Sequence, residues 1–222
     1  MLDEKTNRQK LNDRISKLEV NSKIILAFDF DELVVPVHLT RKVTQAVSDK
    51  PDLDKLDGLG SCSFEGILYL NSLLNGLSVN EYEGKRDELA KETPWRDGFR
   101  ELLEELMENY SIVFISSGMK DIAESKLKEI GINPNNIFGG EFNISENKID
   151  GSSLVVTDKL KGYIIEKIKE KGKVIGVGHG KGDRIMLENS DVSIGFNSDV
   201  LDLAECEVKY PEEILQIVKN NS

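Results

Sequence analysis

Residues 23–31 read KIILAFDFD, and this stretch decides the fold. The run from Ile24 to Phe28 is apolar at every position, without the alternation expected of a strand that faces water on one side. Such a run is typical of a strand covered on both faces, so it predicts a central strand of a parallel sheet. In open sheets of this kind, ligands bind just beyond the carboxyl ends of the strands. The acids that follow Phe28 are therefore the first candidates for chemistry.

Three more apolar runs have the same character, over residues 112–115, 174–177 and, most weakly, 192–196. Apolar stripes at helical spacing lie between the runs. Their members are Phe99, Leu102, Leu103, Leu106 and Met107, then Met119, Ile122, Ala123, Leu127 and Ile130, then Leu160, Ile164, Ile165 and Ile168. Strands that alternate with helices in this way predict an α/β fold with a doubly wound parallel sheet.

Local signals place the ends of these helices. Thr93 and Pro94 have the residue types of an N-cap and a first helical position, so we expect the first of the three helices to begin there. Gly131 and Gly172 are expected to end the other two. The first residues, 3–20, have the apolar spacing of one more amphipathic helix, which would pack on this domain.

Residues 37–92 break the alternation, because they contain no convincing parallel strand. Apolar stripes near 43–47 and over 64–74 predict two helices, and the sequence SVNE at 78–81 has the pattern of a capping box that opens a third. We therefore expect a helical insert directly after the first strand. The predicted domains are an α/β core of residues 1–36 plus 93–222 and a helical cap of residues 37–92, with Pro36 and Pro94 near the two connections.

Composition excludes several classes of protein. The chain has 222 residues and a formal charge of −11, which disfavours nucleic acid and anionic membrane surfaces as partners. Its apolar fraction of 39% is ordinary for a globular protein, and no apolar run approaches membrane-span length. The first residues are charged where a signal peptide would be apolar, so we expect a cytoplasmic protein. Cys62 and Cys206 lie far apart without metal-ligand spacing and are expected to be reduced thiols.

Asp29 and Asp31 are the sharpest candidates for chemistry. Their spacing puts both carboxylates on one side of the strand end unless the backbone turns there. Two carboxylates this close repel each other, and a divalent cation is the usual compensation. Acids at strand ends also cap the next element, so the pair alone does not decide the function.

Other candidates follow the later strands. Ser116, Ser117 and Gly118 end the second run and are expected to open a helix, where hydroxyls and free amides favour an anion such as phosphate, although a serine there can also be a plain N-cap. Lys161 lies in a helical stripe, where a lysine is most often solvated surface. Asp183 follows a glycine-rich loop and is either a helix N-cap or a metal ligand.

The order of these motifs resembles that of the haloacid dehalogenase superfamily: strand and Asp-x-Asp, helical insert, strand and Ser-x-Gly, helix with Lys, strand and Gly-x-Gly-x-x-Asp. Two stretches are similar to the phosphoserine phosphatases in particular, ISSGMKDIAESKLKEIGI and LKGYIIEKIKEKGKVIGVGHGKGD. The resemblance covers residues 23–197 and implies a Rossmann-like core with a cap inserted after the first strand.

The resemblance also implies a role for each matched residue. Asp29 would be the nucleophile that becomes an aspartyl-phosphate, and Asp31 the general acid and base, with its carbonyl on the metal. Ser116, with its neighbours Ser117 and Gly118, would bind the phosphoryl group. Lys161 would neutralise the nucleophile and the phosphate. These types suit the chemistry, because a carboxylate attacks phosphorus only where the negative charges are screened.

Asp183 completes the match as the second acid of the last motif, so the implied metal ligands are Asp29, Asp31 and Asp183. Three positions depart from the phosphoserine phosphatases. His38 replaces a Glu that pairs with the substrate ammonium, and Asn71 falls near an Arg for the substrate carboxylate. His179 replaces an Asp that binds Mg²⁺ directly.

The predicted function is a Mg²⁺-dependent phosphatase that acts on a small cytosolic phosphate ester through an aspartyl-phosphate. Phosphoserine is not the expected substrate, and a nucleotide or sugar phosphate is a further possibility. The alternative is a weakened or inactive relative that binds a phosphorylated ligand or a protein partner. For His179, the open outcomes are direct ligation by Asp183, a softer ion such as Mn²⁺ or Zn²⁺, an imidazole that points away, or a hydrogen bond to a backbone carbonyl of its own loop.

Overall fold

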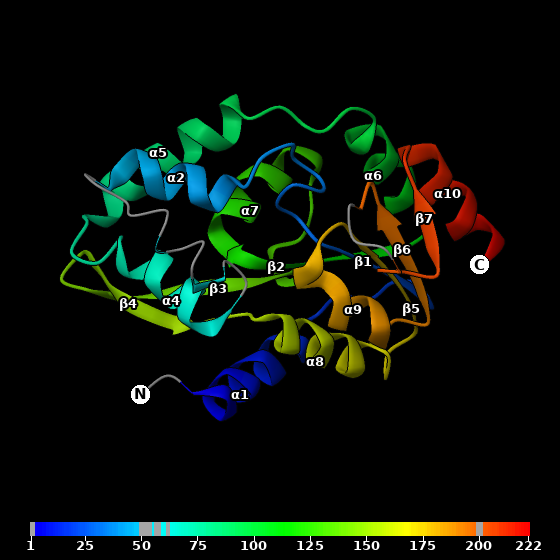
Figure 1. Ribbon diagram of the computed structural model, residues 1–222, viewed down its shortest axis with the longest axis horizontal. Helices are drawn as coiled ribbons and strands as arrows, with labels where there is room; N and C mark the ends of the chain where they lie inside the picture. Colours follow the sequence, from blue (N-terminus) through cyan, green and yellow to red (C-terminus); the bar gives the residue numbers. More distant parts are fainter. Residues whose placement is uncertain (1–2, 49–54, 56–58, 61–62, 199–201) are drawn as a thin grey trace.

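The computed structural model, which describes residues 3–48, 55, 59–60, 63–198 and 202–222, is built around a seven-stranded sheet (Figure 1). Its strands are β1 (Ile24–Phe28), β2 (Ser111–Met119), β3 (Ile137–Ser145), β4 (Lys148–Leu154), β5 (Lys173–Gly178), β6 (Val192–Phe196) and β7 (Cys206–Val208). Their order across the sheet is β4-β3-β2-β1-β5-β6-β7, and only β3 and β4 pair antiparallel. The predicted central strand β1 therefore lies between β2 and β5, where the strand order changes direction.

Helices cover both faces of this sheet (Figure 1). They are α1 (Glu4–Ile15), α2 (Leu39–Val47), α4 (Phe64–Ser72), α5 (Val79–Glu92), α6 (Phe99–Met107), α7 (Lys120–Leu127), α8 (Asp158–Ile168), α9 (Arg184–Asn189) and α10 (Pro211–Asn220). Short 3-10 turns lie at Lys128–Ile130, Pro134–Asn136 and Lys181–Asp183.

The two faces of β1 belong to two separate apolar layers. Ile25 and Ala27 pack with side chains of α1, α8 and α9, whereas Leu26 and Phe28 pack with those of α6, α7 and α10. All four side chains are fully buried. This burial on both sides explains the unbroken apolar run and confirms the doubly wound α/β fold.

The β3–β4 hairpin is the element that the sequence patterns do not reveal. Its outer half is exposed and alternates polar residues with Phe142 and Ile144, so neither strand forms a continuous apolar run. A two-residue turn joins the strands, with Glu146 at φ 49° and Asn147 at φ 60°. Two residues in the left-handed region match the twist of an antiparallel strand pair. This turn is therefore the feature of the sequence from which the hairpin could have been predicted. The short edge strand β7 also escapes prediction.

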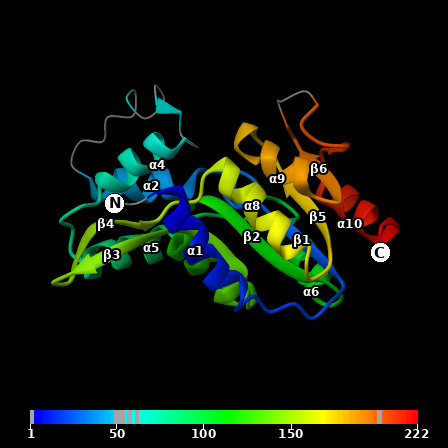
Figure 2. The ribbon, with the colours of Figure 1, turned by 90° about the horizontal axis from the view of Figure 1, so that it is seen from below.

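The described part of the insert contains the helices α2, α4 and α5. The insert is tied to the hairpin, which runs beside α4 in Figure 2. Gly76 donates a backbone hydrogen bond to the carbonyl of Ile149, and the amide of Ile149 donates to Leu77. The insert and the β3–β4 hairpin are therefore joined by backbone hydrogen bonds. The division of the chain at residues 37–92 stays a prediction.

Of two predicted helix starts, that at Thr93 is wrong, whereas α5 begins after Ser78 as predicted but without the capping box. Thr93 does not begin α6 but ends α5, because the residue before a proline is driven into extended backbone; its ψ is 120°. Helix α6 begins instead after Gly98, which has φ 76°. Ser78 does precede α5 but makes no side-chain cap. Its backbone instead forms an isolated bridge with Lys148 of the hairpin.

Within the described residues, no helix has the length and apolarity needed to cross a membrane. Cys206 is a free, partly buried thiol, as expected. Cys62 lies outside the described residues.

Candidate active site

The carboxyl ends of β1, β2 and β5 meet the first turns of α2 and α8 around a cavity of about 310 Å³. The cavity contains every predicted site residue except Asn71. Its lining is Asp29, Asp31, Glu32, His38, Ser116, Ser117, Gly118, Lys161, His179, Gly180, Lys181, Gly182 and Asp183. Segments that are far apart in the chain therefore converge at the edge of the sheet where ligands bind in such folds.

Lys161 holds two carboxylates together at the floor of the site. Its Nζ lies 2.7 Å from Oδ1 of Asp29 and 2.7 Å from Oδ1 of Asp183, and all three side chains are almost fully buried. This lysine is therefore not solvated helix surface. Burial opposes ionisation of Asp29, but Lys161 and His179 outweigh it and hold the pKa of that carboxyl well below its usual range. Burial likewise opposes the charge on Lys161, yet its two carboxylate partners raise its pKa.

Asp31 has the opposite electrostatic environment. Burial raises the pKa of its carboxyl, and the nearby charge of Asp29 raises it further, against the opposing effect of His38. The carboxyl accepts a 2.7 Å hydrogen bond from the amide of Leu39 and a 3.3 Å hydrogen bond from the hydroxyl of Thr40. Two acids whose environments separate their pKa values are suited to different roles, one as a charged nucleophile and one as a proton donor.

The backbone turns immediately after these acids. Glu32 lies in the left-handed region at φ 59°. Arg96 donates side-chain hydrogen bonds to the carbonyls of Glu32 and Leu33, and its amide donates to the carbonyl of Val34. Arg96 thus fixes the loop that carries both acids. The sequence does not reveal this, because Arg96 lies beyond the insert and belongs to no motif.

Residues Ser116 to Gly118 lie inside β2 rather than at the start of a helix. The predicted helix-opening role is wrong, because β2 continues to Met119 and α7 has no side-chain cap. Ser116 Oγ accepts a 2.9 Å hydrogen bond from the amide of Gly118, so the segment curls towards the cavity. The hydroxyl of Ser117 is buried without a hydrogen-bond partner, although it lines the cavity.

Thr40 is a second residue that the sequence does not single out. Its hydroxyl donates to Asp31 and accepts a 3.1 Å hydrogen bond from the amide of Met119. Gly118 allows this close approach. A Cβ atom there would lie 2.3 Å from the Thr40 hydroxyl and 2.6 Å from Oδ2 of Asp31.

The loop after β5 brings His179 between the acids. Oδ2 of Asp183 accepts hydrogen bonds from the amides of His179 and Gly180, at 2.9 and 3.1 Å. This places Nδ1 of His179 at 3.3 Å from Oδ2 of Asp29 and 3.5 Å from Oδ2 of Asp183. Nδ1 is buried and makes no hydrogen bond, so it is not satisfied by a carbonyl of its own loop.

Asp29, His179 and Asp183 form a cluster that fits a metal ion. One ligand atom from each lies within 4.8 Å of the others. The cluster contains two of the three predicted ligands, Asp29 and Asp183, with His179 as a third group. The predicted ligand at Asp31 is its backbone carbonyl, which stays a prediction, and its carboxyl accepts hydrogen bonds from Leu39 and Thr40. Two carboxylate oxygens and one imidazole nitrogen without a hydrogen bond are a suitable donor set for a divalent cation.

His38 and Asn71 differ in position. His38 caps α2 by accepting a hydrogen bond from the amide of Arg41, and its Nδ1 lies 3.5 Å from Oδ2 of Asp31. Asn71 is almost fully buried away from the cavity and donates a 3.0 Å hydrogen bond to Ser152 of the hairpin. Asn71 therefore joins α4 to β4 and does not face the acids.

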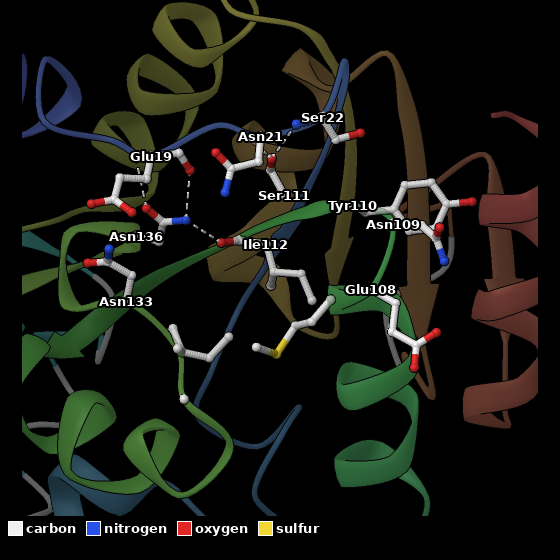
Figure 3. A pocket seen from close by; sticks show the side chains of 13 residues that line it. Glu19, Asn21, Ser22, Glu108, Asn109, Tyr110, Ser111, Ile112, Asn133 and Asn136 are labelled. Atoms are coloured by element: carbon white, nitrogen blue, oxygen red, sulfur yellow. Dashed lines mark hydrogen bonds between the residues drawn. The ribbon is translucent and has the colours of Figure 1, made fainter.

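A second cavity, of about 230 Å³, lies at the opposite end of β2 (Figure 3). Its polar groups are used internally. Asn136 donates to the carbonyls of Glu19 and Ile112, and the hydroxyl of Ser111 accepts from the amide of Asn21. These bonds attach the start of β1 to β2, which is a structural role.

Comparison with known proteins finds two similar phosphoserine phosphatases. That of Methanocaldococcus jannaschii is 28% identical over 191 residues, which cover 81% of this chain and 87% of the relative. That of Archaeoglobus fulgidus is 25% identical over 188 residues, 79% of this chain and 53% of the relative, so the match spans about half of that protein. No protein-family model matches the chain.

Solved structures share the fold. A phosphoserine phosphatase with bound substrate superposes with a TM-score of 0.72 at 21% identity, covering 90% of this chain and 99% of the other. A HAD family hydrolase from Salmonella enterica serovar Typhi gives 0.71 at 14% identity, covering 95% and 80%.

Proposed function

Because this chain is a phosphoserine-phosphatase-like protein of the haloacid dehalogenase superfamily, we propose that it hydrolyses small phosphate monoesters through phosphorylation of Asp29. One observation carries the proposal: a single cavity holds a buried carboxylate whose pKa is lowered and a buried carboxyl whose pKa is raised. This pairing supplies a nucleophile, Asp29, and a proton donor, Asp31, two residues apart in the chain.

In the first step, an oxygen of Asp29 attacks phosphorus while the bond to the leaving oxygen breaks. The protonated Asp31 gives its proton to that oxygen. In the second step, water attacks phosphorus and gives a proton to Asp31. The bond between phosphorus and Asp29 then breaks, which releases phosphate and restores both acids.

The surrounding groups support the phosphoryl group. Lys161 lies 2.7 Å from Asp29 and balances charge beside the nucleophile. The unpartnered hydroxyl of Ser117 and the side chain of Ser116 are donors at the cavity wall. A divalent cation, Mg²⁺ or an ion such as Mn²⁺, would screen the charges of carboxylate and phosphate. Asp29, His179 and Asp183 are the residues suited to hold it.

We propose that the substrate is a small cytoplasmic phosphate ester other than phosphoserine. An amino-acid ammonium requires a carboxylate partner, and His38 offers none. The substrate carboxylate favours a bidentate arginine, and the position matched to one, Asn71, is uncharged and lies outside the cavity, hydrogen-bonded to Ser152. Loss of both partners, at about 1.5–3 kcal/mol for each charged hydrogen bond, would weaken phosphoserine binding by about a hundredfold to ten-thousandfold. Nucleotide and sugar phosphates remain candidates.

The decisive experiment compares wild-type protein with Asp29→Asn on p-nitrophenyl phosphate and a panel of phosphorylated metabolites, with Mg²⁺ or Mn²⁺ added. We expect turnover by the wild type, background rates for Asp29→Asn, and wild-type rates for the control Asp150→Asn, whose side chain is exposed on β4. Wild-type rates in Asp29→Asn would refute the nucleophile. Phosphoserine as the best substrate would refute the specificity.

A second candidate function rests on His179, which stands where the family has an acid. A wild-type protein that cleaves no phosphate ester with either ion, yet binds inorganic phosphate, would favour a non-catalytic binding protein.

A further inference from the structure

We propose that His179 is a direct metal ligand and that the site therefore selects a divalent transition-metal ion such as Mn²⁺ over Mg²⁺. The inference rests on the proposed function, because that function is what gives the bound metal its role. His179 would give the site a preference among divalent ions that Asp29 and Asp183 alone would not provide.

The separations between the candidate ligand atoms fit a single ion. Nδ1 of His179 lies 3.3 Å from Oδ2 of Asp29 and 3.5 Å from Oδ2 of Asp183. Two ligands that each lie about 2.1 Å from one cation are separated by roughly 3.0–3.5 Å in octahedral or tetrahedral geometry. The two carboxylates also keep their other oxygens, Oδ1, on Lys161. The Oδ2 atoms and Nδ1 therefore share one side of the cluster.

The imidazole is oriented as a ligand. Nδ1 is buried and makes no well-formed hydrogen bond, and its neighbours are the two carboxylate oxygens of Asp29 and Asp183 that would share the ion with it. Nε2 lies 3.7 Å from a carboxylate oxygen of Glu32. A carboxylate beside one imidazole nitrogen holds the proton there, which leaves the lone pair of the other nitrogen free for a metal. Glu32 has φ 59°, and Arg96 holds its carbonyl.

The donor set discriminates against Mg²⁺. Mg²⁺ prefers oxygen ligands, whereas the affinity of a site that includes nitrogen rises along the divalent transition metals, of which Mn²⁺ is the weakest binder. Lys161 already balances part of the charge of Asp29 and Asp183. An imidazole as third group adds no negative charge to attract a strongly hydrated ion. Both effects lower the affinity for Mg²⁺ more than that for Mn²⁺.

The first test measures binding of Mn²⁺ and of Mg²⁺ to untagged, metal-free protein by calorimetry, without substrate. We expect the wild type to bind Mn²⁺ at least about tenfold more tightly than Mg²⁺. His179→Asp should bind Mg²⁺ more tightly than the wild type and lose most of the preference. Glu32→Gln, which keeps every ligand, should weaken Mn²⁺ binding by about tenfold or more through loss of the orienting carboxylate.

The second test identifies the nitrogen. The chain has two histidines, His38 and His179, so nitrogen coupling to bound Mn²⁺ in pulsed electron paramagnetic resonance can be assigned by substitution. We expect the coupling in the wild type and in His38→Gln, and its loss in His179→Gln. Circular dichroism of each variant checks that the fold is retained.

Equal affinities for the two ions, or the absence of coupling in the wild type, would overturn the inference. So would coupling that survives in folded His179→Gln. Metal binding as expected without cleavage of any ester would refute the proposed function and leave the metal assignment standing. Ester cleavage with Mg²⁺ preferred would do the reverse.

Discussion

Replacement of Lys161 by methionine should lower the free energy of unfolding of the metal-free protein by about 3–5 kcal/mol at neutral pH. The ammonium bonds two carboxylates at 2.7 Å, and the side chains of Lys161, Asp29 and Asp183 are exposed by only 3%, 6% and 2%. Methionine keeps most of the apolar volume, so the loss comes from two buried acids left without their shared cation. For a chain of this size the melting temperature should fall by about 6–20 °C.

The effect should depend on pH with a definite sign. In the wild type the pKa of Asp29 is lowered, so its pairing stabilises the fold above the ordinary value of 3.8 and is lost as pH falls through the lowered value. The pKa of Lys161 is raised, so its contribution is present below 10.5 and is lost as pH rises through the raised value. In Lys161→Met the buried Asp29 loses the cation that lowers its pKa and takes up a proton more readily. The stability difference between the two proteins should therefore be smaller at about pH 4.5 than at about pH 7.5.

Urea unfolding followed by circular dichroism, with a chelator present, measures both quantities. Lys159→Met is the matched control, because Lys159 is exposed on the same helix; its stability should stay within about 0.5 kcal/mol of the wild type. The reasoning fails if Lys161→Met is as stable as the wild type at neutral pH. It also fails if the loss is the same at both pH values, since the cause would then be packing rather than charge.

Three further predictions concern neighbouring features. Gly118→Ala should reduce phosphatase activity far more than stability, because the new methyl would displace Thr40 and Asp31; parallel rate and melting measurements check this. Phosphatase kcat/KM should fall as pH rises through the raised pKa of Asp31, which loses the proton it donates, and a pH–rate profile that stays level to high pH would contradict this. Arg86→Met should destabilise the fold by about 1–3 kcal/mol in urea unfolding, because the mostly buried Arg86 donates a hydrogen bond to the half-buried Asp121, whereas the exposed Arg100→Met should change little.

The elements that the sequence predicts are those with burial on both faces. β1, β2 and β5 contain continuous apolar runs, β6 contains a weaker one interrupted by Ser193, and each strand lies where its run predicts. The β3–β4 hairpin has no such run, because its outer half is exposed and is stabilised by contacts with the insert. Those contacts are long-range, so no local pattern encodes them.

The candidate site shows the same division. Residues that follow buried strands, such as Asp29 and Asp183, can be predicted because the topology brings strand ends together. Thr40 and Arg96 cannot, since each acts through a backbone group or carboxyl brought near it by the tertiary fold. Asn71 fails for the opposite reason. Its predicted place came only from its position along the insert. In the structure its side chain faces the hairpin and donates a hydrogen bond to Ser152.

The structure divides control of the two acids between separate parts of the chain. Asp29 is kept ionised by Lys161, which is 132 residues away on α8 of the core. Asp31 is held by the amide of Leu39 and the hydroxyl of Thr40, at the first turn of α2 in the insert. Spacing in the sequence brings the acids together, but it does not determine which one carries the proton. That difference arises because Asp29 is paired with an ammonium of the core, whereas burial and the charge of Asp29 raise the pKa of Asp31 and the donors of the insert offset only part of this rise.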